Sequence, residues 1–262
     1  MTADEGESAA PRAEPAGPRR RDGFRERGGQ VTRTEAFVDA AFAFAVTLLV
    51  ISFDRVPANV PELITALKGI PAFAASFVLV ALFWHAHHVW SRRIGLDDIG
   101  SVLLSLLLVF LVLVWVYPLR MLFLSAFAWF SEIALPDGME IPWGLEIRGY
   151  ADIRTMFLIY GVAWSSLGFV IAALYRHAWR RRERLGLDLE EQVRVRGEIA
   201  TWLWVPVTGV VSIATTLAVP DPPPAWAAGA PGLVYFLMFF SGAVGALAER
   251  RARRRLSPAG GG

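Results

Sequence analysis

One carboxylate stands out because of where it lies in the chain. Asp39 is the only ionisable residue among residues 36–53, a stretch that is otherwise apolar apart from Thr47 and Ser52. A stretch of this length matches one crossing of a membrane by a helix. A charged side chain inside such a span is costly, so we expect Asp39 to face protein or water rather than lipid and to serve a function.

Candidate partners for Asp39 lie on its own helix and on the next apolar stretch. Arg33 precedes it and can reach along the end of the same helix. Three histidines, His85, His87 and His88, lie at the end of the next apolar stretch, at a similar depth in an antiparallel pair of helices. We therefore predict a hydrogen-bonded cluster of Asp39 with Arg33 and one of these histidines, which would hold the first helix in place.

The histidines also suggest a metal site. His85 and His88 are three positions apart and share one face of a helix. The nearest carboxylates in sequence are Asp97 and Asp98, so we favour no metal and expect no cofactor. An alternative role for the two histidines is titration near neutral pH. The neighbouring aromatic and basic residues are expected to form an ordinary interfacial belt: Trp84, Trp90, Arg92 and Arg93.

The composition defines the class of protein. Hydrophobic residues make up 55% of the 262 residues, which include ten Trp, and the mean hydropathy of +0.43 is too high for an ordinary soluble domain. The chain has no cysteine, which excludes disulfides and thiol chemistry, and its net charge of +2 implies no nucleic-acid partner. The sequence contains no P-loop, G-x-S-x-G or H-E-x-x-H motif, so we do not expect an enzyme.

Six apolar segments predict an all-α integral membrane protein with six transmembrane helices, at about residues 36–53, 69–90, 99–123, 156–175, 199–219 and 226–247. Residues 1–32 are predicted to be a disordered, basic, Pro/Gly-rich tail, residues 33–248 the transmembrane domain, and residues 249–262 a basic C-terminal tail. Residues 176–196 form a charged connection and a candidate amphipathic helix. In the fourth span, small residues at helical spacing predict close packing: Gly161, Ser165, Gly168 and Ala172.

Arginine is distributed unevenly among the connections. The N-terminal tail, the end of the second span, residues 176–196 and residues 250–255 are strongly basic, and they alternate with connections that carry little positive charge. With six spans, every strongly basic segment falls on one side, which predicts that both termini are cytoplasmic. Lys68 is the only lysine, and the chain is rich in Ala, Gly and Pro, which suggests the plasma membrane of a prokaryote.

Large side chains on the first helix define a second candidate site. Phe44, Leu48 and Ile51 share one side of this helix, whereas Asp39 lies about 140° away from Phe44. Thr47 lies about 60° from Phe44, and its hydroxyl either faces the same space or bonds a carbonyl one turn earlier. Periodicity alone leaves such an apolar stripe facing lipid or the protein core in most membrane helices.

These residues resemble a known signature. Arg33, Phe37-Val38-Asp39 and the run FAFAVTLLVI resemble the opening of the first helix in the transmembrane protein 175 potassium channel family, which has Phe-Ser-Asp at the second of these places. Trp84, His87 and His88 match that family's Trp-x-x-His-His pattern. The resemblance implies a motif network of Arg33, Phe37, Asp39, His87 and His88. Here Val38 replaces the serine of the family, and Phe44 replaces an isoleucine.

The resemblance implies a function. In that family the first helices of four subunits line the pore, and the positions of Phe44, Leu48 and Ile51 form apolar constrictions, with Thr47 beside them. We therefore expect a homotetramer in the lipid bilayer that passes potassium, or monovalent cations generally, without the T-V-G-Y-G filter of conventional potassium channels. A proton-coupled secondary transporter and a non-conducting scaffold, plugged by four Phe44 rings, remain as alternatives.

Overall fold

The computed structural model describes residues 19, 22–25, 27, 29–51, 58–134, 149–224 and 227–256, and the statements below refer to these residues. Within these ranges the chain is helical, apart from connections and one isolated β-bridge between Arg19 and Arg25. Six of its helices are long and apolar enough to cross a membrane. The predicted all-α architecture with six spans is confirmed.

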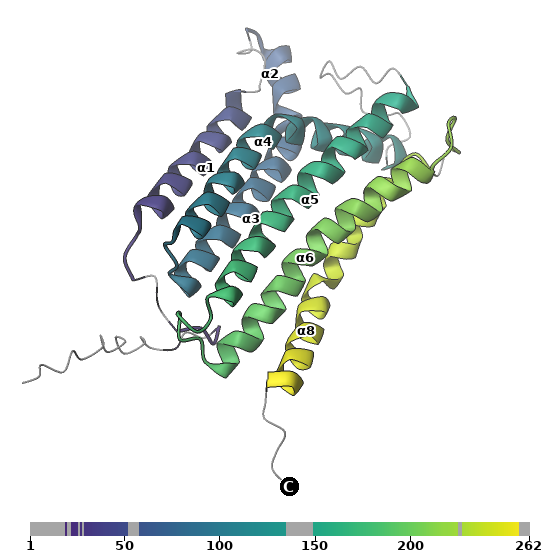
Figure 1. Ribbon diagram of the computed structural model, residues 1–262. Helices are drawn as coiled ribbons and strands as arrows, with labels where there is room; N and C mark the ends of the chain where they lie inside the picture. The colour runs from purple at the N-terminus through teal and green to yellow at the C-terminus, as the bar shows by residue number, and fades with distance from the viewer. Residues whose placement is uncertain are drawn as a thin grey trace, which may run out of the picture.

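The long helices lie side by side, with α1 at one edge of the bundle and α8 at the other (Figure 1). The first three spans are α1 (Arg33–Ile51), α3 (Ile70–Ile94) and α4 (Ile99–Ala134), and a short helix α2 (Val60–Leu67) precedes the second span. The next two are α5 (Tyr150–Arg180) and α6 (Leu189–Ala218). The last consists of α7 (Ala230–Leu233), a 3-10 segment η1 (Val234–Phe240) and α8 (Ser241–Leu256).

Several helices extend beyond the predicted spans, and at the start of α6 a capping pair rather than a change in apolar character sets the boundary. Residues 176–196 do not form a separate amphipathic helix. They divide between the end of α5, a turn and the start of α6. Asp188 caps α6 by accepting a hydrogen bond from the Glu191 backbone N–H, and the Glu191 side chain accepts one from the Asp188 N–H. This reciprocal pair satisfies free backbone donors and starts the helix inside the charged segment.

The small-residue stripe of α5 packs against α6, as predicted. A Cβ atom added at Gly161 would lie 2.4 Å from Ile213 Cγ1, and one added at Gly168 would lie 2.4 Å from Val205 Cγ1. Gly209 of α6 faces α5 in the same way, with the Ser165 hydroxyl oxygen 2.2 Å from the position of its missing Cβ. The two helices therefore approach so closely that their contact surface accepts only small residues at these places.

One end of the bundle collects the basic residues. The start of α1, the ends of α3 and α5, the start of α6 and the end of α8 lie there (Figure 1). We call it the basic end, because Arg92, Arg93, Arg180, Arg194 and the last turn of α8, with Arg253, Arg254 and Arg255, belong to these helix ends.

Several residues of the segment before α1 contact the helices of the bundle. The tail predicted for residues 1–32 was expected to be disordered, and this remains a prediction; residues 1–18, 20, 21, 26 and 28 lie outside the described residues. Phe24, however, is only 1% exposed, and Arg27 contacts the buried Glu191. The physical reason is charge complementarity, because the arginines of the tail meet the acidic first turn of α6.

Candidate functional site

α1 has two unlike faces. One face packs against α3 and α4 and buries five side chains: Glu35, Val38, Phe42, Ala45 and Leu49. The opposite face is free in the single chain. Phe37, Phe44 and Ile51 lie on it at seven-residue spacing and are 54%, 55% and 66% exposed. Seven residues are nearly two helical turns, so these three side chains form one row along the helix.

Most of the predicted constriction residues share this free face. Phe44, Thr47 and Ile51 are exposed, whereas Leu48 is half-buried at its border and packs against the core of the subunit. The Thr47 hydroxyl donates a hydrogen bond to the Ala43 carbonyl, 3.0 Å away, one turn earlier in the helix. The free face therefore presents large apolar side chains and a threonine whose hydroxyl proton is already used.

A row of polar contacts joins α1 to α3, and we call it the polar ladder: Glu35 and Asp39 of α1 with Trp84, His88 and Arg92 of α3. The Trp84 indole N–H donates to Asp39 Oδ1 over 2.8 Å. The buried Glu35 has its Oε1 3.3 Å from Arg92 Nε and 3.7 Å from His88 Nδ1. The rings of Trp84 and His88 stack with their centroids 5.5 Å apart.

The predicted cluster is arranged differently from its expectation. Asp39 bonds Trp84 rather than a histidine, and His88 faces Glu35. His87 is buried and its Nε2 lies 2.9 Å from the Ser105 hydroxyl of α4. Arg33 is exposed and has no hydrogen bond or ion pair with a described residue. Phe37 belongs to the free face rather than to the contacts of Asp39.

Two members of the ladder were missed by sequence reasoning. Glu35 was not singled out, and Arg92 was assigned with Trp84 to an interfacial belt. The missed signal is spacing, because Glu35 and Asp39 are four residues apart and Trp84, His88 and Arg92 follow at the same interval. Residues four apart share a helical face, so two such rows can meet across antiparallel helices.

The described residues contain no group of three or more potential metal ligands.

A further polar cluster lies at the basic end, around Asp98 in the connection between α3 and α4. Asp98 caps α4 by accepting the Ser101 backbone N–H over 2.9 Å, and His177 Nε2 of α5 lies 2.8 Å from Asp98 Oδ1. Arg181 Nε is 3.4 Å from the other carboxylate oxygen. Burial alone would raise the pKa of Asp98, but these hydrogen bonds, first that from the Ser101 backbone and then that of His177, outweigh it and lower the pKa.

Known proteins are similar to this chain over the region that contains the polar ladder and the free face of α1. The family described as the endosomal/lysosomal potassium channel TMEM175 matches residues 33–118, which include the whole polar ladder and the free face of α1. A relative from Marivirga tractuosa named as a potassium channel is 30% identical over 200 residues, covering 75% of this chain and 79% of that protein. A crystal structure of a variant of the potassium channel MtTMEM175, in complex with a nanobody-MBP fusion, matches with a TM-score of 0.75 at 26% identity, covering 88% of this chain and 97% of that one.

Six apolar helices, with polar contacts between the first two spans, define a multi-pass membrane protein, and the solved structure that it matches is a channel. The family match and the relative agree with that class. The chain belongs to the TMEM175 family of potassium channels.

Proposed function

We propose that this chain is one subunit of a homotetramer that passes potassium down its gradient through a central pore lined by α1. The observation that carries the proposal is the free face of α1, where Phe37, Phe44 and Ile51 are more than half exposed while the opposite face is packed. α1 lies at one edge of the subunit (Figure 1), where copies of it can meet at a shared axis.

An assembly is needed for a central pore. A single six-helix chain without an internal repeat does not easily enclose one. Four copies that meet along their free faces would present rings of Phe44, Thr47 and Ile51 to the axis, with Leu48 at the border. An apolar ring of this kind controls flow by dewetting, because an ion must shed water there without polar replacement.

The polar ladder supports this arrangement by defining how α1 is rotated. Asp39 and Glu35 face α3, so a turn of α1 that moved Phe44 away from the axis would break the Asp39–Trp84 bond and leave Glu35 apart from Arg92. A buried carboxylate without its partner is expensive. The motif network of the family therefore acts in this chain mainly through Asp39 and His88. The residues that represent the network here are Arg33, Phe37, Asp39, His87 and His88.

The orientation in the membrane follows from charge. Because the helix ends at the basic end carry most of the arginines, we propose that this end faces the cytoplasm of a prokaryotic cell, with both termini inside. Potassium, the lipid bilayer and three further copies of the chain are then its partners.

Two other functions would require different features. A proton-coupled carrier is expected to have a pair of interrupted helices and charges near the middle of the membrane. Among the described spans, the last one changes helix type, and its 3-10 segment Val234–Phe240 contains no charged residue. A non-conducting scaffold is the other candidate, favoured by Phe44, since four phenyl rings at one level of the axis would narrow it more than aliphatic side chains.

Flux measurements separate these functions. The purified protein and the variants Phe44→Ala and Phe169→Ala are placed in liposomes under a potassium gradient. Phe169 of α5 is 60% exposed, close to the exposure of Phe44, and serves as the matched control. We expect passive potassium flux that rises in Phe44→Ala and is unchanged in Phe169→Ala. Flux that requires a proton gradient would indicate a carrier, silence in all three proteins a scaffold, and equal flux in all three a pore that α1 does not line.

A further inference from the structure

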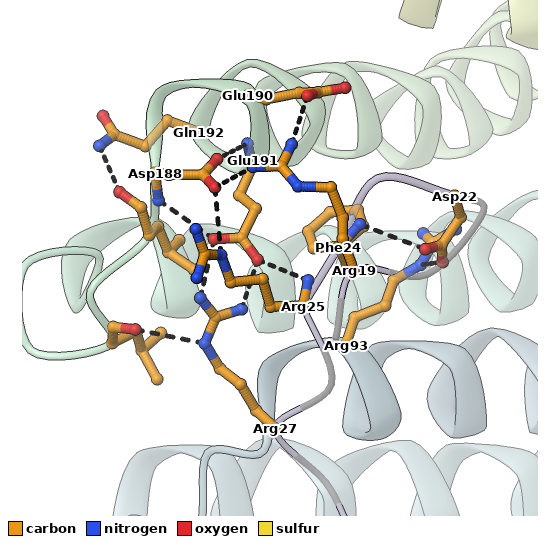
Figure 2. Close-up of polar contacts among 12 residues, drawn as sticks. Arg19, Asp22, Phe24, Arg25, Arg27, Arg93, Asp188, Glu190, Glu191 and Gln192 are labelled. Carbon is orange, nitrogen blue, oxygen red and sulfur yellow. Dashed lines mark hydrogen bonds and ion pairs between the residues drawn. The ribbon is translucent and has the colours of Figure 1, made fainter. Parts of the chain in front are cut away.

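The segment before α1 folds back onto the basic end as a compact unit. We call Arg19, residues 22–25 and Arg27 the strap (Figure 2). It turns at Gly23, whose φ of +82° is in the left-handed region that favours glycine. The Phe24 backbone N–H donates to Asp22 Oδ1 over 3.2 Å, and Arg19 and Arg25 form an isolated antiparallel bridge on either side of the turn.

The strap is anchored first on α6. Glu191, whose side chain is 0% exposed, receives both Nη1 and Nη2 of Arg27 at 2.6 and 2.7 Å, as Figure 2 shows. The Arg25 backbone N–H adds a third bond to Glu191 at 2.8 Å. Such a two-pronged contact between guanidinium and carboxylate holds both distance and orientation. Arg19 also pairs with Asp188 and Glu190.

The second anchor is on α3. Asp22 Oδ2 lies 2.9 Å from Arg93 Nε, and the Arg93 guanidinium carbon lies 4.8 Å from the centre of the buried Phe24 ring. Arg93 in turn bonds Glu198 of α6 over 2.6 Å. Gly95, at the end of α3, lies so close to the strap that an added Cβ would be 3.0 Å from the Arg27 backbone. The strap therefore fills the junction between α3 and α6.

We propose that the strap is a positioning element that holds the basic end of α1 back from the pore axis. This inference rests on the proposed function, in which α1 lines the pore. Residues 28–32 join Arg27 to the first residue of α1, and a link of this length spans at most about 20 Å. Because the link is short, a displacement of the strap displaces the start of α1. The strap thereby connects α1 to α6, a helix that packs against α5 and α8.

The direction of the effect follows from where the anchors lie. α3 packs against α1, and α6 lies farther across the bundle from it (Figure 1), so both anchors lie on the side opposite to the free face of α1. Because the link spans at most about 20 Å, its anchorage on that side limits how far the start of α1 can move toward its copies at the axis. Release of the strap lets the four helix ends approach one another, and flux decreases.

Two changes test the docking and the link separately. The double substitution Phe24→Ala with Arg27→Ala removes both the buried ring and the fork on Glu191. A Gly-Ser-Gly-Ser insertion between Gly29 and Gln30 leaves every strap contact in place and lengthens only the link; a Cβ at Gly29 would meet nothing within 4 Å, so there is room. Arg254→Ala, an exposed arginine in the last turn of α8, is the control for loss of one positive charge.

Docking is measured by hydrogen–deuterium exchange of the peptide covering residues 19–32, and function by potassium flux in liposomes. We expect the double variant to lose protection of the peptide and to conduct about fivefold less, at the lower end of typical coupling between sites. The insertion is expected to keep the protection and lose flux to a similar extent, a result that a merely structural role would not produce. Arg254→Ala is expected to change neither.

The results that overturn the inference differ from those that overturn the proposed function. Unchanged flux after loss of protection, or after the insertion, shows that the strap does not position α1, while the unmodified protein still conducts. Protection that survives the double substitution shows that these contacts do not hold the strap. Silence of the unmodified protein contradicts the proposed function, and the coupling with it, whatever the exchange pattern.

Discussion

α1 and α5 are both apolar membrane spans, yet they have different surroundings. α5 is packed by α4 on one side and α6 on another, and its residues Gly161 and Gly168 let α6 approach closely. α1 is packed on one face only, and its free face carries Phe37, Phe44 and Ile51. In these two spans the size of the side chains along a stripe, rather than apolarity, separates the helix that joins the core of the subunit from the helix with an exposed face.

The largest effect is expected when a large side chain is placed in the small-residue stripe of α5, and the matched change places one on the exposed face of α1. Gly168→Leu places a large side chain where even a Cβ would be 2.4 Å from Val205, so α5 and α6 must separate, and we expect a loss of about 3 kcal/mol or more in the free energy of unfolding. Ala40→Leu, on the exposed face of α1, is the counterpart. It should leave stability nearly unchanged and reduce potassium flux.

Thermal unfolding in detergent, followed by liposome flux, measures both quantities. If Gly168→Leu unfolds at the same temperature as the unmodified protein, the close packing of α5 on α6 is not as the structure describes it. Destabilisation of the single subunit by Ala40→Leu would mean that the free face of α1 is covered by its own chain.

The second prediction concerns how α1 is held, since it lacks the close packing of α5. Arg92→Ala removes the guanidinium that pairs with the buried Glu35 and leaves its carboxylate beside His88 Nδ1, 3.7 Å away, so we expect a loss of about 3 kcal/mol. Arg33→Ala, an exposed arginine at the start of the same helix, should cost less than about 0.5 kcal/mol. Chemical unfolding curves of the two variants give the comparison.

Addition of Glu35→Gln to Arg92→Ala sharpens the second prediction. If the cost comes from an unpaired buried charge, the double variant recovers part of the lost stability, because the neutral amide needs no counter-charge. Equal costs for Arg92→Ala and Arg33→Ala would show that the ladder does not hold α1.

The smallest effect belongs to the basic end of α5, where His177 meets Asp98. The folded state lowers the pKa of Asp98, so the ionised carboxylate contributes stability above its usual pKa of about 3.9, and this contribution is lost as the pH falls through the lowered folded value. Asp98→Ala should therefore cost about 1 kcal/mol at pH 7, with the difference from the unmodified protein undiminished at pH 5 and smaller below about pH 4.

Unfolding midpoints of the two proteins at several pH values check this sign. A difference that grows as the pH falls below about 4 would contradict it, because protonation of the carboxylate would then strengthen the contact. Ser241→Ala, far from this cluster at the start of α8, provides a variant whose difference from the unmodified protein should not depend on this carboxylate.

Prediction from the sequence succeeded where the physical cause is local. The six spans and the small-residue stripe of α5 depend on length, apolar composition and spacing within one segment, all of which can be counted along the chain. Helix ends were predicted less well, since α6 begins at its capping pair Asp188 and Glu191 inside a charged segment. The motif residues Asp39 and His88 were singled out, but their partners Trp84 and Glu35 were not assigned to them.

The amino-acid sequence by itself determined that the chain is a six-span membrane protein, because the cost of placing polar groups in hydrocarbon depends on each segment alone. Only the tertiary structure decided which donor each carboxylate meets. Asp39 reaches Trp84 across 45 positions and the Arg25 backbone reaches Glu191 across 166. Such pairings depend on the rotation and depth of helices that are distant in sequence, and many arrangements of the same six spans would satisfy the membrane equally well.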